Sequence, residues 1–298
     1  MKARAYAKIN LGLEVLFHRS DGYHEIRTIL QTVDLYDCLS FRLRDSGVEL
    51  VTDDPDLPTD EGNLVVRAAR MLAEEVEEAR GAYVELEKTI PAGRGLGGGS
   101  SDAAMTLLAL NELWEAGLSE LDLVRLAARI GMDVPFFLLG GAALGLGRGE
   151  EIFPLDCQHE VPIVLILPDF AISTADAYRN LILTKREPSL KLRDLALSYL
   201  GGRKELLDLV NDLEFATLDY TPAIHQYKEQ LLELGASSSL MSGSGSAVFG
   251  IFDHEALAHS AAARLKNLGI RAIATCTLNR GAYKERRLEI RPRHYGES

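Results

Sequence analysis

Residues 91–104 read PAGRGLGGGSSDAA, and five of the seven residues from Gly93 to Gly99 are glycine. Glycine lets the backbone approach a ligand closely and adopt positive φ angles without strain. An apolar helical run follows directly, so backbone N–H groups and the positive end of the helix dipole would converge on one point. The stretch therefore predicts a phosphate-binding loop. The alternative, a flexible surface linker, does not usually open into a capped apolar helix.

Two common phosphate-binding loops can be tested by their spacing. The P-loop requires a lysine and a Ser or Thr after its last glycine, whereas residues 99–101 read GSS. A G-x-G-x-x-G pattern begins at Gly93, but a second helix, capped by Ser119, follows where a dinucleotide-binding unit needs a strand. Neither loop therefore explains this stretch.

A second glycine–serine stretch, SGSGS at residues 242–246, precedes the apolar run 247–252. Alone it is weak evidence, because many hairpins carry Gly–Ser turns. Two such loops in one chain could hold the two ends of a polyphosphate, or a nucleotide and an acceptor.

The composition limits the class of protein. The chain has 298 residues, 47% hydrophobic and 26% charged, with a formal net charge of −12. This charge disfavours binding to nucleic acids, although local N–H groups and lysines can still hold a small anion. The three cysteines are far apart and indicate thiols of a reducing compartment. Without a secretion signal or an apolar run near the ~20 residues of a membrane span, we expect a cytoplasmic protein with no membrane partner.

The hydrophobic pattern predicts strands and helices in mixed order. Strands are expected at residues 4–17, 26–34, 39–43, 48–52, 82–90, 161–167, 247–252 and 270–278. Helices are expected at residues 64–77, after the glycine loop to about residue 114, at 119–130, at 174–235 with a break at 185–188, and at 255–268. Pro135 should keep Asp133 in a turn, and the charged tail after Arg280 is expected to fray. This order predicts an α+β protein of two lobes, 1–155 and 156–298, with the active site in the cleft between them.

Four segments together resemble one enzyme family. The glycine loop, AKINLGLEV at residues 7–15, GMDVPFF at 131–137 and SGSGSAVFG at 242–250 are similar in content and order to the motifs of the GHMP kinases. The family comprises galactose, homoserine, mevalonate and phosphomevalonate kinases. The resemblance implies a two-lobed fold and transfer of the γ-phosphoryl group of ATP to a small-molecule hydroxyl.

Narrower features resemble one branch of that family. AKINLGL at residues 7–13, RSDGYHEI at 19–26 and NDLE at 211–214 are typical of the branch whose acceptor is a sugar alcohol linked to cytidine diphosphate, an isoprenoid precursor. The resemblance implies direct in-line transfer to the 2-hydroxyl of that acceptor. A kinase for another acceptor, and a sensor that binds ATP without turnover, are the alternatives. The sequence leaves open whether the protein is a monomer or a homodimer.

The resemblance assigns the catalytic roles to two residues. Asp133 matches the family's catalytic aspartate and is expected to be the base for the hydroxyl; the alternative is a turn aspartate bonded to local backbone. Lys8 lies in an apolar strand, where an ammonium group must reach water or meet a negative group. As charge partner of Asp133 it would stabilise the developing alkoxide; the alternative is an exposed lysine at a sheet edge.

The resemblance also assigns the ATP site to the glycine loop. The expected ATP-binding residues are Pro91, Ala92, Gly93, Arg94, Gly95, Leu96, Gly97, Gly98, Gly99, Ser100 and Ser101. Arg94 departs from the small residue usual there and would touch phosphate or point to solvent. Mg²⁺ is expected with ATP; its ligands are unknown, with Ser101 a candidate, although Ser100 and Ser101 could be plain helix caps. Asp102 is expected to interact with the helix dipole.

The acceptor site draws on several separate segments. Its expected residues are Asn10, Tyr23, His24, Tyr178, Ser242, Gly243, Ser244 and Gly245. Tyr23 and Tyr178 could stack on a pyrimidine, and the imidazole of His24 could hydrogen-bond its polar edge. Without the resemblance each would be an ordinary half-buried aromatic or surface histidine. The other histidines lack ligand spacing, so no zinc site is expected.

Overall fold

The computed structural model describes residues 1–76, 80–181, 192, 194, 209–217 and 221–289. Within these residues the first sheet has seven strands: β1 Lys2–His18, β2 His24–Arg44, β3 Val48–Thr52, β4 Gly81–Glu87, β5 Ala142–Leu146, β6 Glu151–Leu155 and β11 Leu288–Glu289. The strand order is β11-β1-β2-β4-β3, and β5 pairs with another part of β2 and with β6. All pairs are antiparallel except β3 with β4.

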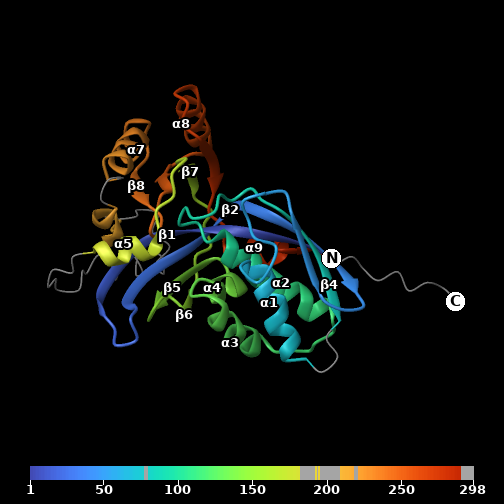
Figure 1. The fold of residues 1–298 in the computed structure, drawn as a ribbon. Coiled ribbons are helices and arrows are strands. Elements are labelled where there is room, and N and C mark those ends of the chain that lie inside the picture. Colours follow the sequence, from blue (N-terminus) through green and yellow to red (C-terminus); the bar gives the residue numbers. More distant parts are fainter. Residues whose placement is uncertain (77–79, 182–191, 193, 195–208, 218–220, 290–298) are drawn as a thin grey trace.

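The hairpin of β1 and β2 crosses the whole molecule (Figure 1). Two separate strands were predicted where β2 is continuous, and that prediction was wrong. Residues 35–38 read LYDC, which contains no glycine or proline to stop the pairing with β1. The register of the pairing shifts at three places. Such shifts mark β-bulges, and bulges bend a strand. The strand β1 is buried along most of its length, so it shows an apolar run rather than alternation.

Four helices cover one side of this hairpin (Figure 1). They are α1 Leu64–Glu74, α2 Gly98–Leu113, α3 Glu120–Ile130 and α4 Val134–Leu139. The side chains of Asn63 and Ser119 cap α1 and α3 as predicted, the latter in a capping box. Pro135 lies in the first turn of α4, where its missing N–H costs nothing, and Asp133 lies in the turn before it, also as predicted.

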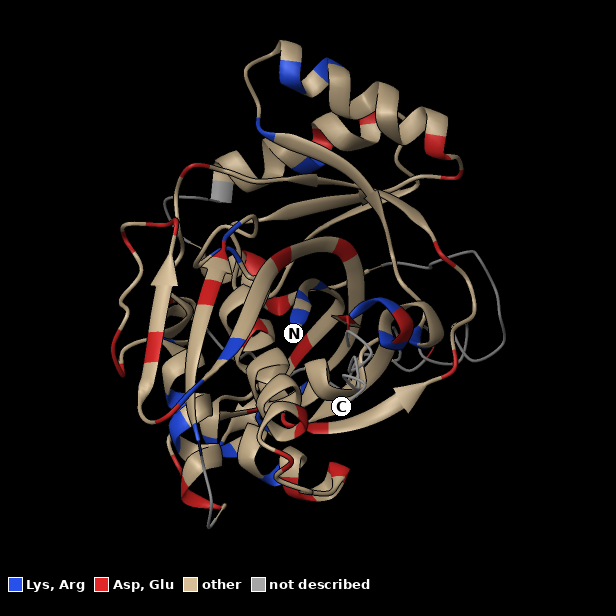
Figure 2. Cartoon of the chain, turned by 90° about the vertical axis from the view of Figure 1, so that its right-hand side faces the viewer, with Lys and Arg blue, Asp and Glu red and all other residues tan. Residues whose placement is uncertain are grey.

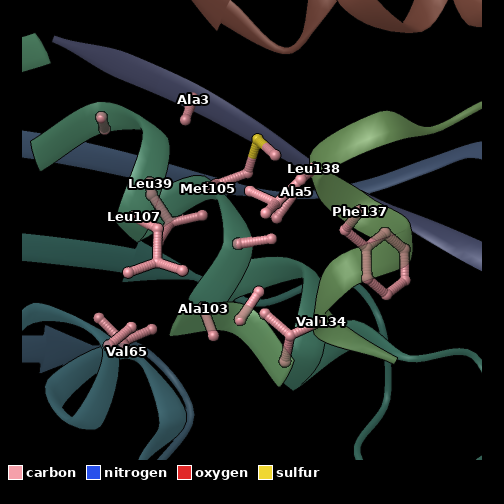
Figure 3. Packing of buried hydrophobic residues seen from close by; sticks show 14 of the residues in the cluster. Ala3, Ala5, Leu39, Val65, Ala103, Met105, Leu107, Val134, Phe137 and Leu138 are labelled. Carbon is pink, nitrogen blue, oxygen red and sulfur yellow. The ribbon is translucent and has the colours of Figure 1, made fainter. Parts of the chain in front are cut away.

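The helix after the glycine loop, α2, is enclosed by other elements. Side chains from α1, α2, α4 and both long strands form one apolar cluster, with Met105 and Leu107 of α2 among its labelled members (Figure 3). A helix buried on most sides cannot shift without disturbing a close-packed core. The core thus fixes the position of the N-terminus of α2.

The second sheet lies on the other side of the hairpin (Figure 1). The strands of this sheet are β7 Pro162–Ile166, β8 Ser238–Met241, β9 Val248–Ile251 and β10 Ala272–Cys276. The described helices in the same part of the chain are α5 Thr174–Asn180, the 3₁₀ helix η1 Asp212–Ala216, α7 Thr221–Glu233 and α8 Glu255–Asn267. The order β10-β7-β9-β8 places β7 between β9 and β10, which α8 joins as a split βαβ unit. This confirms the predicted strand–helix–strand order. The predicted helical break at 185–188 lies outside the described residues.

The end of the described chain returns to the first sheet. The helix α9 Arg280–Arg286 places Tyr283 in the same cluster as α2, and β11 pairs with β1. The expected fraying after Arg280 is therefore wrong for residues 280–289, because an apolar ring in the charged segment is fully buried. The change of sheet falls between β6 and β7, at residues 156–161; the division at residue 155 stays a prediction.

The predicted α+β class with two parts is confirmed. Residues of both charges are spread over the helices and strands of both parts in the view of Figure 2. None of the helices that the structure describes is long and apolar enough to cross a lipid bilayer.

Candidate active site

A cavity of about 1210 Å³ brings the predicted site residues together. Its lining comes from β1, the tip of the β1–β2 hairpin, the glycine loop, the turn before α4, the β5–β6 turn, α5 and the second glycine–serine loop. The predicted residues that line it are Lys8, Asn10, Tyr23, His24, Pro91, Ala92, Gly93, Arg94, Gly95, Leu96, Gly97, Gly98, Gly99, Ser100, Asp133, Tyr178, Gly243 and Ser244. Ser101, Ser242 and Gly245 lie behind this lining.

The glycine loop has a backbone that other residues could not adopt. Gly95 and Gly97 have φ angles of 75° and 70°. A Cβ atom on Gly95 would lie 2.0 Å from the carbonyl oxygen of Ser242, and one on Gly97 would lie 2.8 Å from the Phe137 ring. Glycine is therefore required at both positions, and α2 begins directly after Gly97.

The two glycine–serine loops are bonded to each other. The hydroxyl of Ser242 donates to the carbonyl of Gly95 at 2.9 Å, and the N–H of Ala247 donates to the carbonyl of Arg94 at 3.1 Å. The Arg94 side chain donates to the carbonyls of Pro168 and Asp169, both at 2.9 Å. Arg94 thus neither points freely into solvent nor offers its whole guanidinium to phosphate; it joins the glycine loop to the segment after β7.

A buried charge cluster beneath the glycine loop was not predicted. The ammonium of Lys88 lies 2.5 Å from a carboxylate oxygen of Asp37 and 2.9 Å from one of Asp102. The other oxygen of Asp37 accepts from the N–H groups of Thr89 and Ile90, directly before the loop. Both ends of the loop are thus tied to one lysine. The local sequence does not single out these three residues, because only the fold brings them into contact.

The expectation for Asp102 was wrong. It lies beyond the first turn of α2, 2% exposed, and pairs with Lys88 rather than with the helix dipole. Burial raises the pKa of Asp102 to about 8, against the opposing attraction of Lys88. For Lys88, burial alone would lower the pKa, but the two carboxylates outweigh it and raise the pKa.

The two predicted catalytic residues face each other. The ammonium of Lys8 lies 3.5 Å from the carboxylate of Asp133 and donates to the amide oxygen of Asn10 at 2.6 Å. Asn10 in turn donates to Thr28 at 2.8 Å, so the lysine is held from the side of the sheet. Lys8 is 4% exposed and is therefore not a lysine at an open sheet edge, whereas the Asp133 side chain is 36% exposed and accessible from the cavity.

Aromatic rings gather at the other end of the cavity. His24 stacks on Tyr178 with 5.2 Å between ring centroids, and His18, which was not predicted, lies edge-on to His24 at 5.0 Å. Tyr23 is 49% exposed. Burial and the neighbouring His18 lower the pKa of His24, while burial and the charge of Asp133 raise the pKa of Tyr178. The hairpin tip and α5 thus form one aromatic surface.

The NDLE segment supports the second glycine–serine loop. The amide of Asn211 donates to the carbonyls of Met241 and Gly243 at 2.9 and 2.7 Å. The carboxylate of Glu214 accepts from the N–H of Met241 at 2.8 Å and pairs with Lys228. The NDLE segment therefore contributes to the site indirectly, because it holds the backbone of the second glycine–serine loop in place.

Comparison with known proteins identifies the family. Residues 63–141 match the model of the GHMP kinases N terminal domain, and residues 195–271 match that of the GHMP kinases C terminal. A crystal structure of homoserine kinase from Cytophaga hutchinsonii shares the fold, with a TM-score of 0.73 at 21% identity over 94% of each chain. The chain belongs to the GHMP kinases, as the sequence motifs indicated.

Closer relatives define the branch. The 4-diphosphocytidyl-2-C-methyl-D-erythritol kinase of Caldicellulosiruptor bescii is 42% identical over 89% of this chain and 94% of its own. The enzyme of the same name from Pelotomaculum thermopropionicum is 40% identical over 93% and 98%. A crystal structure of 4-(cytidine 5'-diphospho)-2C-methyl-D-erythritol kinase has a TM-score of 0.81 at 38% identity, covering 93% of this chain and 99% of that one. The predicted enzyme class, an ATP-dependent small-molecule kinase of this branch, is confirmed.

Proposed function

We propose that the protein transfers the γ-phosphoryl group of ATP to the 2-hydroxyl of 4-diphosphocytidyl-2-C-methyl-D-erythritol, in the non-mevalonate route to isoprenoids. The observation that carries this proposal is the single cavity that joins the glycine loop, the Lys8–Asp133 pair and the aromatic rings. A nucleotide at one end and a cytidyl acceptor at the other would meet at the pair between them.

The glycine loop is the proposed site of the ATP phosphates. Its backbone leads into the N-terminus of α2, where N–H groups and the helix dipole favour an anion. The loop is held from below by Lys88 and from the side by Ser242. Phosphoryl transfer depends mainly on positioning and electrostatic stabilisation, and a loop fixed in this way supplies the positioning.

Asp133 is the proposed base for the acceptor hydroxyl. Its carboxylate is accessible from the cavity and can accept the hydroxyl proton as the oxygen attacks the γ-phosphorus. The ammonium of Lys8, 3.5 Å away, would offset the negative charge that develops on the attacking oxygen. Asn10 holds that ammonium in place.

Mg²⁺ is proposed to accompany ATP. In phosphoryl-transfer sites this ion usually keeps water ligands and binds one or two protein groups besides the phosphates. No cluster of three or more His, Cys, Asp or Glu occurs in the part of the chain that the structure describes. Ser101 remains the candidate ligand: its hydroxyl is buried under the loop and has no hydrogen-bond partner among the described residues. The ion would offset charge on the phosphates.

The proposal is tested by ADP release from ATP and Mg²⁺ with a panel of acceptors. Fast release is expected with the cytidyl acceptor alone, and none with homoserine, mevalonate, galactose or no acceptor. Release with another member of the panel would leave a kinase but exclude the cytidyl assignment. ATP binding without release for any acceptor would favour a nucleotide sensor.

The catalytic role of Asp133 has its own test. Asp133→Asn keeps the shape but cannot accept a proton, so turnover should fall by about 10²- to 10⁴-fold while ATP affinity stays within a fewfold. Asp45→Asn, which changes an exposed aspartate in the turn after β2, serves as the control. A turnover of Asp133→Asn near that of the control would remove Asp133 from the role of base.

A further inference from the structure

Arg148 lies in the turn between β5 and β6 and lines the cavity at its aromatic end. The turn is fixed to the hairpin, because the N–H of Ile26 donates to the carbonyl of Gly147 at 2.8 Å. The guanidinium carbon of Arg148 lies 5.0 Å from the centre of the Tyr23 ring. The guanidinium therefore lies over one face of the ring to which the proposed function assigns the pyrimidine, and leaves the other face for the base.

Glu150 holds this arginine in one orientation. One carboxylate oxygen accepts from Nε of Arg148 at 2.8 Å, and the other accepts from its backbone N–H at 2.8 Å. Burial favours the neutral carboxyl, but these hydrogen bonds outweigh it and lower the pKa of Glu150. A guanidinium that is already ordered loses little side-chain entropy when it binds a ligand.

The two terminal nitrogens of Arg148 are free of hydrogen-bond partners among the described residues. The other lysines and arginines in the described lining are engaged. Lys8 contacts Asn10 and Asp133, Arg94 donates to two carbonyls, and Arg179 pairs with Asp176. Among the lysines and arginines of the described lining, Arg148 is therefore the one whose two terminal guanidinium nitrogens both lack a hydrogen-bond partner.

We infer that Arg148 binds the diphosphate group that links the cytidine and sugar-alcohol parts of the acceptor, and thereby selects acceptors that carry a diphosphate. The inference rests on the proposed function. A guanidinium presents two parallel N–H donors, which match a phosphate group in a bidentate contact. A base stacked on the other face of the Tyr23 ring would bring its 5′-diphosphate within reach of Arg148, in the same cavity that Lys8 and Asp133 line.

The test compares cytidine 5′-diphosphate with cytidine, bound to the full chain and measured by calorimetry. Arg148→Met should weaken binding of the diphosphate by about 10- to 100-fold, the loss expected for a charge-assisted contact, and leave cytidine within about twofold. Arg148→Lys keeps the charge without the bidentate geometry, so its affinity for the diphosphate should lie between those of wild type and Arg148→Met. The affinity of wild type for the diphosphate should decline more steeply with salt than that of Arg148→Met.

Arg42→Met is a matched control. Arg42 also pairs with a glutamate, Glu85, and lies over a tyrosine ring, Tyr83, but outside the cavity lining. The Arg42→Met variant should bind cytidine 5′-diphosphate and cytidine with the affinities of wild type. Melting curves of all variants check that the fold is kept.

Two outcomes would overturn the inference. Equal losses for the diphosphate and for cytidine would assign Arg148 to the nucleoside, and unchanged diphosphate affinity would show no contact. Turnover of the cytidyl acceptor by wild type is measured alongside. If wild type does not turn over the cytidyl acceptor, the proposed function fails, but the ratio of the affinities for cytidine 5′-diphosphate and cytidine still decides what Arg148 binds. If wild type does turn it over and Arg148→Met does not change that ratio, only this inference fails.

Discussion

The two ends of the cavity are built in different ways. The glycine-loop end presents backbone, and its side chains lie beneath it: Asp37 and Asp102 are 0% and 2% exposed. The aromatic end presents side chains, among them Tyr23 at 49% exposure, from a hairpin tip, a turn and a short helix. The glycine loop leads into a helix that the core encloses, whereas the aromatic end combines side chains from three separate segments.

This difference corresponds to two kinds of site in a kinase family: a phosphate site that its members share, and an acceptor site that differs between members. The homoserine kinase of Cytophaga hutchinsonii has the same fold at 21% identity. A backbone site for phosphate depends on the glycines and on the support under them, whereas recognition of a particular acceptor requires particular side chains on segments that can change. Substitutions at the loop end should therefore affect stability and ATP together, and those at the aromatic end should affect the acceptor alone.

The largest effect is expected from Lys88→Met. The change removes the cation that the buried side chains of Asp37 and Asp102 share, and breaking such a buried ion pair costs about 3–5 kcal/mol of unfolding free energy. Denaturant unfolding measures it, and the KM for ATP should rise more than the KM for the acceptor. Arg42→Met removes an exposed pair and should cost at most about 1 kcal/mol. Equal costs for the two variants would show that the cluster does not support the loop.

Gly95→Ala tests the loop itself. The new methyl group meets the Ser242 carbonyl and the residue must keep a positive φ, so unfolding free energy should fall by about 1–3 kcal/mol and ATP should bind more weakly. Gly269→Ala separates the two causes, because Gly269 has a φ of 78° but no atom within 4 Å of the added carbon. If both variants bind ATP as wild type does, the close approach of the two loops has no role in the site.

Tyr23→Ala tests the aromatic end. Loss of a stacking ring should raise the KM for the cytidyl acceptor about tenfold, with the KM for ATP and the melting temperature nearly constant. Tyr83→Ala, beneath Arg42 on the first sheet, is the control for loss of a tyrosine. A parallel rise in both KM values for Tyr23→Ala would contradict the division of the cavity into two ends.

The fold could largely be predicted because its elements carry local patterns. The capping residues Asn63 and Ser119 and the apolar spacing that follows them specify α1 and α3 without reference to the rest of the chain. The length of β2 could not be predicted, since it depends on the partner strand that keeps residues 35–38 paired. Tyr283 likewise looks like part of a charged tail until the cluster around α2 is assembled.

The site could be predicted where a residue type is unusual in its sequence neighbourhood. Lys8 in an apolar strand and the glycines of the loop met that condition. Lys88, Asp37 and Asp102 did not, because they are separated by 14 residues or more and only the fold brings them into contact. Arg148 was missed for the same reason: a turn arginine is ordinary until the hairpin places Tyr23 against it.

The smallest effect concerns pH and the aromatic end. The pKa of His24 is lower in the folded protein than its ordinary value, because of burial and His18, so the unfolded chain binds the proton more readily. Stability should therefore be fully present above about pH 6.5 and decline as pH falls from there toward the lower folded pKa. His24→Gln should lose less stability than wild type between pH 7 and pH 5 in denaturant unfolding. His225→Gln, an exposed histidine of α7, controls for removal of an imidazole elsewhere. Because the loop end contains no histidine in its described lining, a slope that persists unchanged in His24→Gln would place the pH response outside the cavity.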